Sequence, residues 1–225
     1  MGQCFFTMSQ RFNRHVRLHS LGTLNGSEHG WQTPLSSFGA AGSLELREEF
    51  MATSGDSRVD AIVREPMAQD SADLNDLVRR IPPLAENSIY CNLLHCSHFS
   101  ETCAVAERDG ELVAFVTGYI HPKQPDTYFL WQIGVHEHGR GQGLALRMIQ
   151  HILARPCCRH VVALEATASS TNEASRAMFE SVARAEGAQF ERHRRYYPPG
   201  IFGADNHIAE DLLRISPLAT PRGAR

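Results

Sequence analysis

The pattern of apolar and polar residues becomes regular from residue 60 onward, where short apolar runs alternate with stretches of helical period. Apolar residues three or four apart predict helices, and short apolar runs between Gly, Pro or Asp predict strands. Asp109-Gly110, between two such runs, predicts a tight hairpin turn. This order predicts an α/β (α+β) domain in which a mixed sheet carries helices on both faces. The predicted strands are 61–64, 103–107, 112–120, 128–135, 161–167 and 212–215, and the predicted helices are 70–81, 88–98, 144–154 and 172–185.

The first 58 residues differ from the rest of the chain. They are rich in Ser, Gly, Thr and His and lack a sustained apolar period, which predicts a poorly ordered extension. Three arginines among the first 17 residues would suit a transit peptide, but the glutamates over 45–49 do not. An alternative is that Met51 is the true start. We expect one folded domain over 59–216 and a flexible tail over 217–225.

Composition narrows the class of protein. The chain has 225 residues, 42% hydrophobic and 21% charged, with a formal net charge of -3, as in an ordinary globular protein. Without a basic excess we expect no nucleic-acid partner. No apolar stretch approaches the roughly 18 residues of a membrane helix, so we expect no membrane association. The six cysteines form no regular framework and predict a reduced, cytoplasmic setting.

Cysteines and histidines lie close together at 91–98, where a metal site must be considered. Their spacing matches no zinc template. We therefore expect no metal, and a structural or incidental role for Cys91, His95, Cys96 and His98.

The most informative passage for chemistry runs from Arg140 to Ala145, where a predicted strand leads into the helix 144–154. Unpaired N–H groups and the helix dipole attract phosphate to a helix N-terminus. Gly141 and Gly143 let the backbone approach a ligand closely, and Arg140 adds a positive charge. The loop lacks the Lys-Ser/Thr of a P-loop and is not GxGxxG. A plain strand-to-helix turn is the alternative.

Two motifs resemble the GNAT superfamily of N-acetyltransferases. Arg140-x-x-Gly143-x-Ala145 is similar to the superfamily's loop for the pyrophosphate of coenzyme A, and Asn172-x-x-Ser175-x-x-Met178-Phe179 to its second motif. The resemblance implies a GNAT-type, mostly antiparallel sheet and acetyl-CoA as co-substrate. Asn172 also suits a helix cap. The implied cofactor-binding residues are Ile133, Val135, Arg140, Gly141, Gly143, Leu144, Ala145, Asn172 and Phe179.

Other stretches resemble one branch of that superfamily, the L-2,4-diaminobutyrate acetyltransferases of ectoine biosynthesis. They are 83–99, 125–132, 153–156 and 202–212, and the resemblance covers roughly residues 60 to 215. It implies transfer of acetyl from acetyl-CoA to the γ-amine of L-2,4-diaminobutyrate, by direct attack in a ternary complex. The cysteines are then not nucleophiles. Enzymes of this kind are often dimers, so a homodimer is expected.

The resemblance also implies roles for single residues, with two departures. Phe179 replaces the superfamily's usual proton-donating Tyr, so we predict Tyr90 as the hydroxyl donor instead. Ala85 replaces the branch's Asp, and Glu86 is predicted to compensate for it. The predicted substrate-binding residues are Glu86, Asn87, Trp131, His207 and Glu210, and Glu210 is also predicted to accept the amine's proton through water.

Each of these roles has a plainer alternative. Tyr90 could be a half-buried structural side chain, and Trp131 a core residue. His207 and Glu210 could belong to a solvated loop and strand start. For the whole chain, the alternatives are an acetyltransferase of another small diamine or a polyamine, and a non-catalytic acetyl-CoA-binding module.

Overall fold

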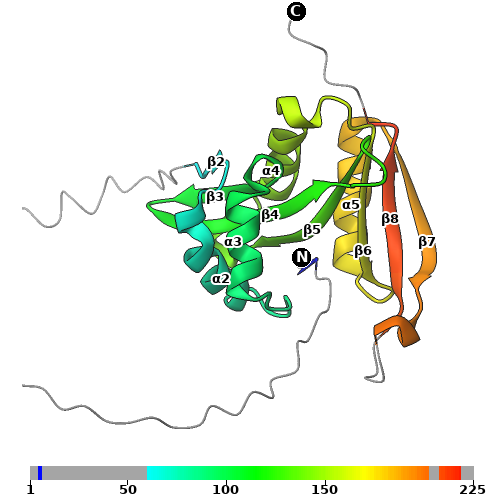
Figure 1. Cartoon of the computed structure of the whole chain (residues 1–225), viewed down its shortest axis with the longest axis horizontal. Helices are drawn as coiled ribbons and strands as arrows, with labels where there is room; N and C mark the ends of the chain where they lie inside the picture. Colours follow the sequence, from blue (N-terminus) through cyan, green and yellow to red (C-terminus); the bar gives the residue numbers. More distant parts are fainter. Residues whose placement is uncertain (1–4, 7–59, 203–207, 219–225) are drawn as a thin grey trace, which may run out of the picture. The chain divides into compact units, whose positions relative to one another are not determined.

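The computed structural model describes residues 5–6, 60–202 and 208–218. Its strands form one sheet in the order β2-β3-β4-β5-β6-β8-β7, with β1 paired to β5 (Figure 1). Among the described strands, β5 and β6 make the one parallel pair. The strands are β1 (Phe5–Phe6), β2 (Ile62–Arg64), β3 (Ala104–Arg108), β4 (Glu111–Ile120), β5 (Thr127–Val135), β6 (Ala163–Ser169), β7 (Gln189–Tyr197) and β8 (Glu210–Ser216). The predicted mixed, mostly antiparallel α/β fold is confirmed.

Four α-helices connect these strands, each close to its predicted place: α2 (Ser71–Arg79), α3 (Ile89–Ser97), α4 (Leu144–Leu153) and α5 (Glu173–Glu186). Two of them begin at polar caps. The Ser88 hydroxyl accepts from the Cys91 N–H at 3.1 Å, and the Asn172 side chain accepts from the Ser175 N–H at 3.0 Å. The predicted capping role of Asn172 is therefore confirmed.

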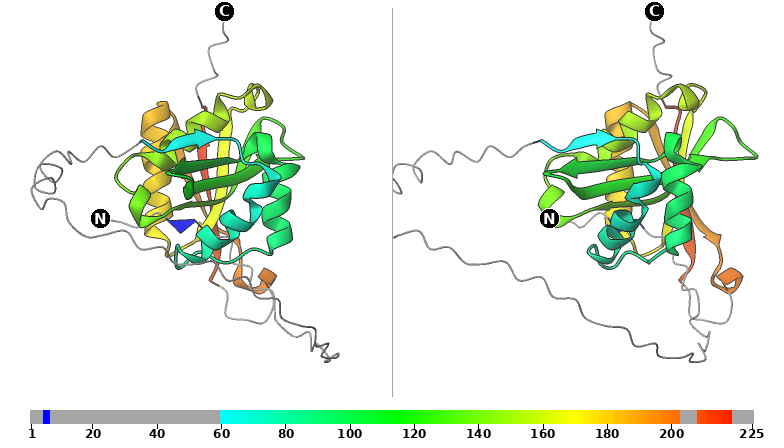
Figure 2. Two further views of the ribbon diagram at one scale, coloured as in Figure 1. Left: turned by 90° about the vertical axis from the view of Figure 1, so that its left-hand side faces the viewer. Right: turned by 60° about the vertical axis from the view of Figure 1, so that its left-hand side comes forward.

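Helices cover both faces of the sheet (Figure 2). On one face, α4 and α5 pack over strands β3 to β8 around a core that includes Met148, Ile149, Phe179 and Leu213. On the other face, α2 and α3 form a smaller core with strands β3 and β4. Burial of these apolar side chains stabilises the fold by roughly 25 cal/mol for each Å² removed from water.

The second face becomes polar where it reaches β6 and β8. Residues directly opposite each other on neighbouring strands point to the same side, and here the opposed pairs are Glu165 with Arg214, Thr167 with Leu212, and Ser169 with Glu210. The guanidinium of Arg214 donates to the Glu165 carboxylate. This polar half-face is where charged ligands could be recognised, since the apolar core of α2 and α3 lies over β3 and β4 instead.

The predicted hairpin turn at Asp109-Gly110 is present between β3 and β4. Both residues have positive φ, 51° and 80°, as a two-residue turn of mirror-image type requires.

Strands β1 and β7 were not predicted. Strand β7 is the exposed edge of the sheet and carries mostly polar side chains, so it lacks the apolar alternation on which the other predictions relied. The register of β7 against β8 shifts between His193 and Tyr197. Asp211 holds this irregularity, because its carboxylate accepts from the Arg195 N–H and from Arg192 Nε, both at 2.7 Å.

Candidate active site

The loop before α4 is open and uncapped. Gly143 occupies the N-cap position, and no side chain of the described residues caps the first N–H groups of the helix. Gly141 and Gly143 have φ of 78° and 66°, which only Gly adopts readily. A Cβ built on either glycine would meet no described atom within 4 Å. The loop therefore presents exposed N–H groups, with the side chain of Arg140 also exposed, to open space that can hold a phosphate group.

Strand β5 has an edge next to this loop that does not pair with β6. It pairs with β6 only over Thr127 to Phe129 and then continues to Val135, while the two strands lean apart (Figure 1). The side chain of Ile133 is buried and that of Val135 is half-buried, so their main-chain groups are what this edge presents. Strand β1 pairs with this stretch at Ile133 and Gly134, which confirms that the edge accepts main-chain partners.

Two predicted cofactor residues lie on α5 or at its start. Asn172 is half-buried at the cap. Phe179 is 0% exposed within the larger of the two cores. Leu144 is also buried in that core, whereas Ala145 is half-buried. Phe179 and Leu144 thus support the site by packing in the core.

Glu210 is the first residue of β8, and its side chain is 1% exposed. Its atom Oε2 is buried and has no hydrogen-bond partner among the residues that the structure describes. An uncompensated buried carboxylate is costly, so such a group calls for a cationic partner. The alternative of a solvated strand start is wrong for Glu210. His207, its predicted partner, lies outside the described residues.

Comparison with known proteins decides between the candidate phosphate ligands. Residues 70–183 match the model of the acetyltransferase (GNAT) family. The L-2,4-diaminobutyric acid acetyltransferase of Methylotuvimicrobium alcaliphilum is 43% identical over 160 residues, covering 68% of this chain and 89% of the relative. That of Chromohalobacter salexigens is 41% identical over 165 residues, covering 73% and 85%.

The chain belongs to the GNAT family, among the L-2,4-diaminobutyric acid acetyltransferases.

A solved structure agrees with this assignment. The diaminobutyrate acetyltransferase of Paenibacillus lautus, in complex with L-2,4-diaminobutyric acid and coenzyme A, is 31% identical to this chain. The two superpose with a TM-score of 0.66 over 70% of this chain and 95% of that one. The predicted family and its co-substrate, acetyl-CoA, are therefore confirmed.

In this acetyltransferase the segment around Ala85 is fastened to β5 by Gln132. Gln132 Nε2 donates to the Ala85 carbonyl at 2.9 Å, and its Oε1 accepts from Asn87 Nδ2 at 2.9 Å. Gly134 leaves room for the side chain of Leu84 next to this segment, because a Cβ there would lie 2.8 Å from Leu84 Cδ1. Asn87 thus holds its own segment in place. The prediction missed Gln132, although a buried Gln inside an otherwise apolar strand was a signal.

Trp131 lies beside a series of aromatic rings. Its ring centroid is 5.9 Å from that of His95, which in turn is 5.8 Å from Phe99. Burial lowers the pKa of His95 to about 4, so this imidazole is neutral at neutral pH. Trp131 itself is half-buried, so one alternative for it, a purely core side chain, is wrong. Its remaining exposed surface is available to a ligand.

Tyr90 and Glu86 stand at the surface. Tyr90, in the first turn of α3, is 65% exposed, so the alternative of a half-buried structural Tyr is wrong. Glu86 is also exposed, and its carboxylate lies 3.4 Å from Arg79 Nε. The Glu86 carboxylate therefore already has a cationic partner, Arg79, at the surface.

The thiols of the acetyltransferase domain are poor nucleophiles where they are buried. Burial raises the pKa of Cys96, Cys103 and Cys158 to about 12 and raises that of Cys91 as well. A thiol with such a pKa stays protonated at neutral pH and does not attack a thioester. Within the described ranges, no group of three or more His, Cys, Asp or Glu side chains could hold a metal ion.

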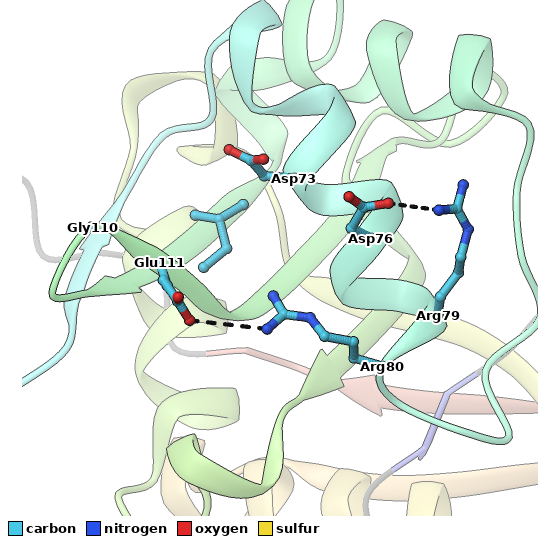
Figure 3. A pocket seen from close by; sticks show the side chains of 7 residues that line it. Asp73, Asp76, Arg79, Arg80, Gly110 and Glu111 are labelled. Atoms are coloured by element: carbon cyan, nitrogen blue, oxygen red, sulfur yellow. Dashed lines mark hydrogen bonds and ion pairs between the residues drawn. The ribbon is translucent and has the colours of Figure 1, made fainter. Parts of the chain in front are cut away.

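A separate surface hollow of about 480 Å³ lies between α2 and the β3–β4 turn (Figure 3). Its charges pair with one another: Arg79 with Asp76 at 2.6 Å, and Arg80 with Glu111 at 4.0 Å. None of the predicted site residues lines it. The hollow is therefore distinct from the acetyl-transfer site.

The helices of the described chain include none that is both long and apolar enough to span a bilayer.

Proposed function

We propose that this enzyme transfers the acetyl group of acetyl-CoA to the γ-amine of L-2,4-diaminobutyrate. The observation that carries the proposal is the buried, unbonded carboxylate oxygen of Glu210, a group suited to an ammonium or amine. It occurs in a chain whose relatives are named for acetylation of this diamino acid. A buried carboxylate also discriminates strongly against ligands that leave it unpaired.

The cofactor is held by backbone and packing groups. The open loop from Arg140 to Gly143 binds the diphosphate of coenzyme A, and Asn172 contacts its pantetheine arm. Main-chain N–H groups of Ile133 to Val135 polarise the thioester carbonyl, because donors placed for the developing oxyanion stabilise the transition state.

The amine must lose a proton before it attacks, since its pKa resembles that of Lys, about 10.4. Glu210 accepts this proton through water. The neutral amine attacks the thioester carbonyl directly, and its nitrogen becomes positively charged. That nitrogen loses its second proton to water, and the tetrahedral intermediate expels the thiolate of coenzyme A as the carbon–sulfur bond breaks. Tyr90 donates a proton to the thiolate, since Phe179 has no proton to give, and water then reprotonates the Tyr90 phenolate. Trp131 offers its exposed face to the substrate's other ammonium group, and Asn87, Glu86 and His207 complete the acceptor site.

A competition assay tests the proposal. Diaminobutyrate, ornithine, lysine and putrescine are supplied separately and together with one acetyl-CoA concentration, and the products are separated and identified by mass spectrometry and NMR. We expect diaminobutyrate to have the highest kcat/KM and its γ-acetyl isomer to be the product. Preferred acetylation of another amine, or of the α-amine, contradicts the proposal.

An acetyltransferase of another small diamine is the second candidate, and Ala85 favours it. The branch pattern places an Asp at this position, whereas Ala85 has no carboxylate. The carboxylate of the neighbouring Glu86 already pairs with Arg79. The same competition assay separates the two functions. A non-catalytic acetyl-CoA-binding module would bind acetyl-CoA and acetylate none of the four amines.

We further propose that the enzyme acts in the cytoplasm as a homodimer whose catalytic domain spans 59–216. The five cysteines that the structure describes are all free, which suits a reducing compartment. Light scattering coupled to gel filtration measures the oligomeric state directly, and a monomer at micromolar concentration contradicts the dimer.

A further inference from the structure

Arg108 links the proposed diphosphate loop to the segment that precedes it. It is the last residue of β3, more than 30 positions before the loop. Its Nη1 donates to the main-chain carbonyl of His138 at 2.8 Å, and its Nη2 donates to the side-chain Oε1 of Gln142. Gln142 Nε2 also lies 3.4 Å from the same His138 carbonyl. One guanidinium thus joins His138, two positions before the loop, to Gln142, which lies between the two glycines.

The loop needs such a support because its other side is open. Both glycines have left-handed backbone conformations, and no described atom lies within 4 Å of a Cβ built on either of them. Glycine is the residue with the greatest backbone freedom, so a loop with two glycines is costly to fix in one shape. An N–H cradle binds phosphate well only when its donors are already aimed at the ligand.

Other contacts fix the approach to the loop but not its centre. The His136 side chain accepts from the His138 N–H at 3.4 Å, and the His136 N–H donates to the Val113 carbonyl at 2.8 Å. Main-chain bonds from the Gly139 N–H to the His136 carbonyl, at 2.8 Å, and from the Arg140 N–H to the Glu137 carbonyl, at 3.2 Å, continue this support as far as Arg140. Within the part of the chain that the structure describes, the side-chain bonds that reach Gln142, between the glycines, are those with Arg108 and the His138 carbonyl.

We propose that Arg108 is a positioning residue for the coenzyme A diphosphate, acting through Gln142 and the His138 carbonyl. The inference rests on the proposed function only in that this loop binds coenzyme A. The planar fork of the guanidinium is essential to the role, because it directs two N–H groups to two separate acceptors. The charge of Arg108 is secondary, since Arg140 already supplies a cation at the loop.

Arg108→Lys separates these two contributions. Lysine keeps the positive charge and loses the fork, whereas Arg108→Met loses both. We expect Arg108→Lys to weaken coenzyme A binding, measured by calorimetry without acceptor, by about tenfold, as for the loss of one or two hydrogen bonds. We expect Arg108→Met to be weaker than Arg108→Lys by no more than about twofold. The KM for acetyl-CoA should rise in parallel, while the KM for the acceptor should stay within about twofold of the wild-type value.

Gln142→Ala tests the route through which Arg108 acts and provides a variant that leaves β3 intact. If Arg108 works through Gln142, the double variant Arg108→Lys/Gln142→Ala binds coenzyme A no more weakly than Arg108→Lys alone. Arg184→Met is the matched control, because Arg184 is exposed near the end of α5 and its removal changes the net charge as Arg108→Met does. Its coenzyme A affinity should equal that of the wild type.

Three results would overturn the inference: wild-type affinity in Arg108→Lys, unchanged affinity in Gln142→Ala, or additive losses in the double variant. A wild-type enzyme that binds coenzyme A but acetylates no diaminobutyrate would contradict the proposed function alone, because the calorimetric test of Arg108 does not involve the acceptor.

Discussion

Tyr197 lies directly opposite Glu210 across the pairing of β7 with β8. The register shift just before Tyr197, held by Asp211, is what places these two residues opposite each other. Burial raises the pKa of Tyr197, and the neighbouring Tyr196 and Glu210 raise it further. The phenol is therefore protonated at neutral pH.

Replacement of Glu210 tests the acceptor site. Glu210→Gln keeps the shape of the side chain and removes the charge, so we expect the KM for diaminobutyrate to rise by tenfold or more, corresponding to about 1.4 kcal/mol or more. The KM for acetyl-CoA should not change. The same variant should unfold at a higher temperature, because an uncompensated buried carboxylate has been removed.

Steady-state kinetics and thermal unfolding measure both effects. Glu191→Gln is the matched control, since Glu191 is an exposed carboxylate on β7. An unchanged KM for diaminobutyrate in Glu210→Gln would argue against its proposed role.

Tyr90→Phe tests the proton donor. Tyr90 is 65% exposed, so removing its hydroxyl should disturb packing little. We expect kcat to fall by about 100-fold, within the range for loss of a general acid, while acetyl-CoA still binds. Rapid-mixing kinetics and calorimetry measure the two quantities, and near-wild-type turnover would remove Tyr90 from the mechanism.

Ala85→Asp tests the departure from the branch pattern. The carbonyl of residue 85 is fixed by Gln132, so the new carboxylate should sit on a segment already in place. We expect the KM for diaminobutyrate to fall about threefold to tenfold, in keeping with an added charge pair of roughly 1 kcal/mol. Ala85→Asn, which is similar in shape but uncharged, should not have this effect. Equal behaviour of the two variants would show that the carboxylate has no partner.

His95 should make the domain less stable as the pH falls. Its folded pKa of about 4 lies below its ordinary value of 6.5, so the unfolded chain binds more protons between these values. The free energy of unfolding should therefore decrease by about 2 to 3 kcal/mol from pH 7 to pH 4.5 on account of His95.

Denaturant unfolding at several pH values measures that slope. His95→Gln cannot titrate, so its slope should be shallower whatever its stability at pH 7. Some slope should remain, because burial also lowers the pKa of His136 and His151. An unchanged slope in His95→Gln would contradict the assignment.

The elements that could be predicted from the sequence are those whose burial leaves a pattern. Strands β4 to β6 are apolar, and α4 has a clear apolar stripe, so their bounds were close to those observed. The polar edge strand β7 has no such pattern. The loop glycines could be identified from the sequence because they lie between a predicted strand and a predicted helix. The hydrogen bond from Gln132 to Ala85 and the pairing of Tyr197 with Glu210 could not be predicted. Each depends on segments that lie apart in the sequence.

Strand β7 also affects how the protein resists aggregation. An edge strand exposes unpaired main-chain groups that can template further strands, and charged side chains and irregular register are two common protections. The charged side chains of this strand are Glu191, Arg192, Arg194 and Arg195. Its irregular register is the shift beside Tyr197. Salt at about 1 M shortens the screening length to roughly 3 Å and weakens the charges. The irregular register does not depend on ionic strength, so in concentrated salt it becomes the main protection of this edge.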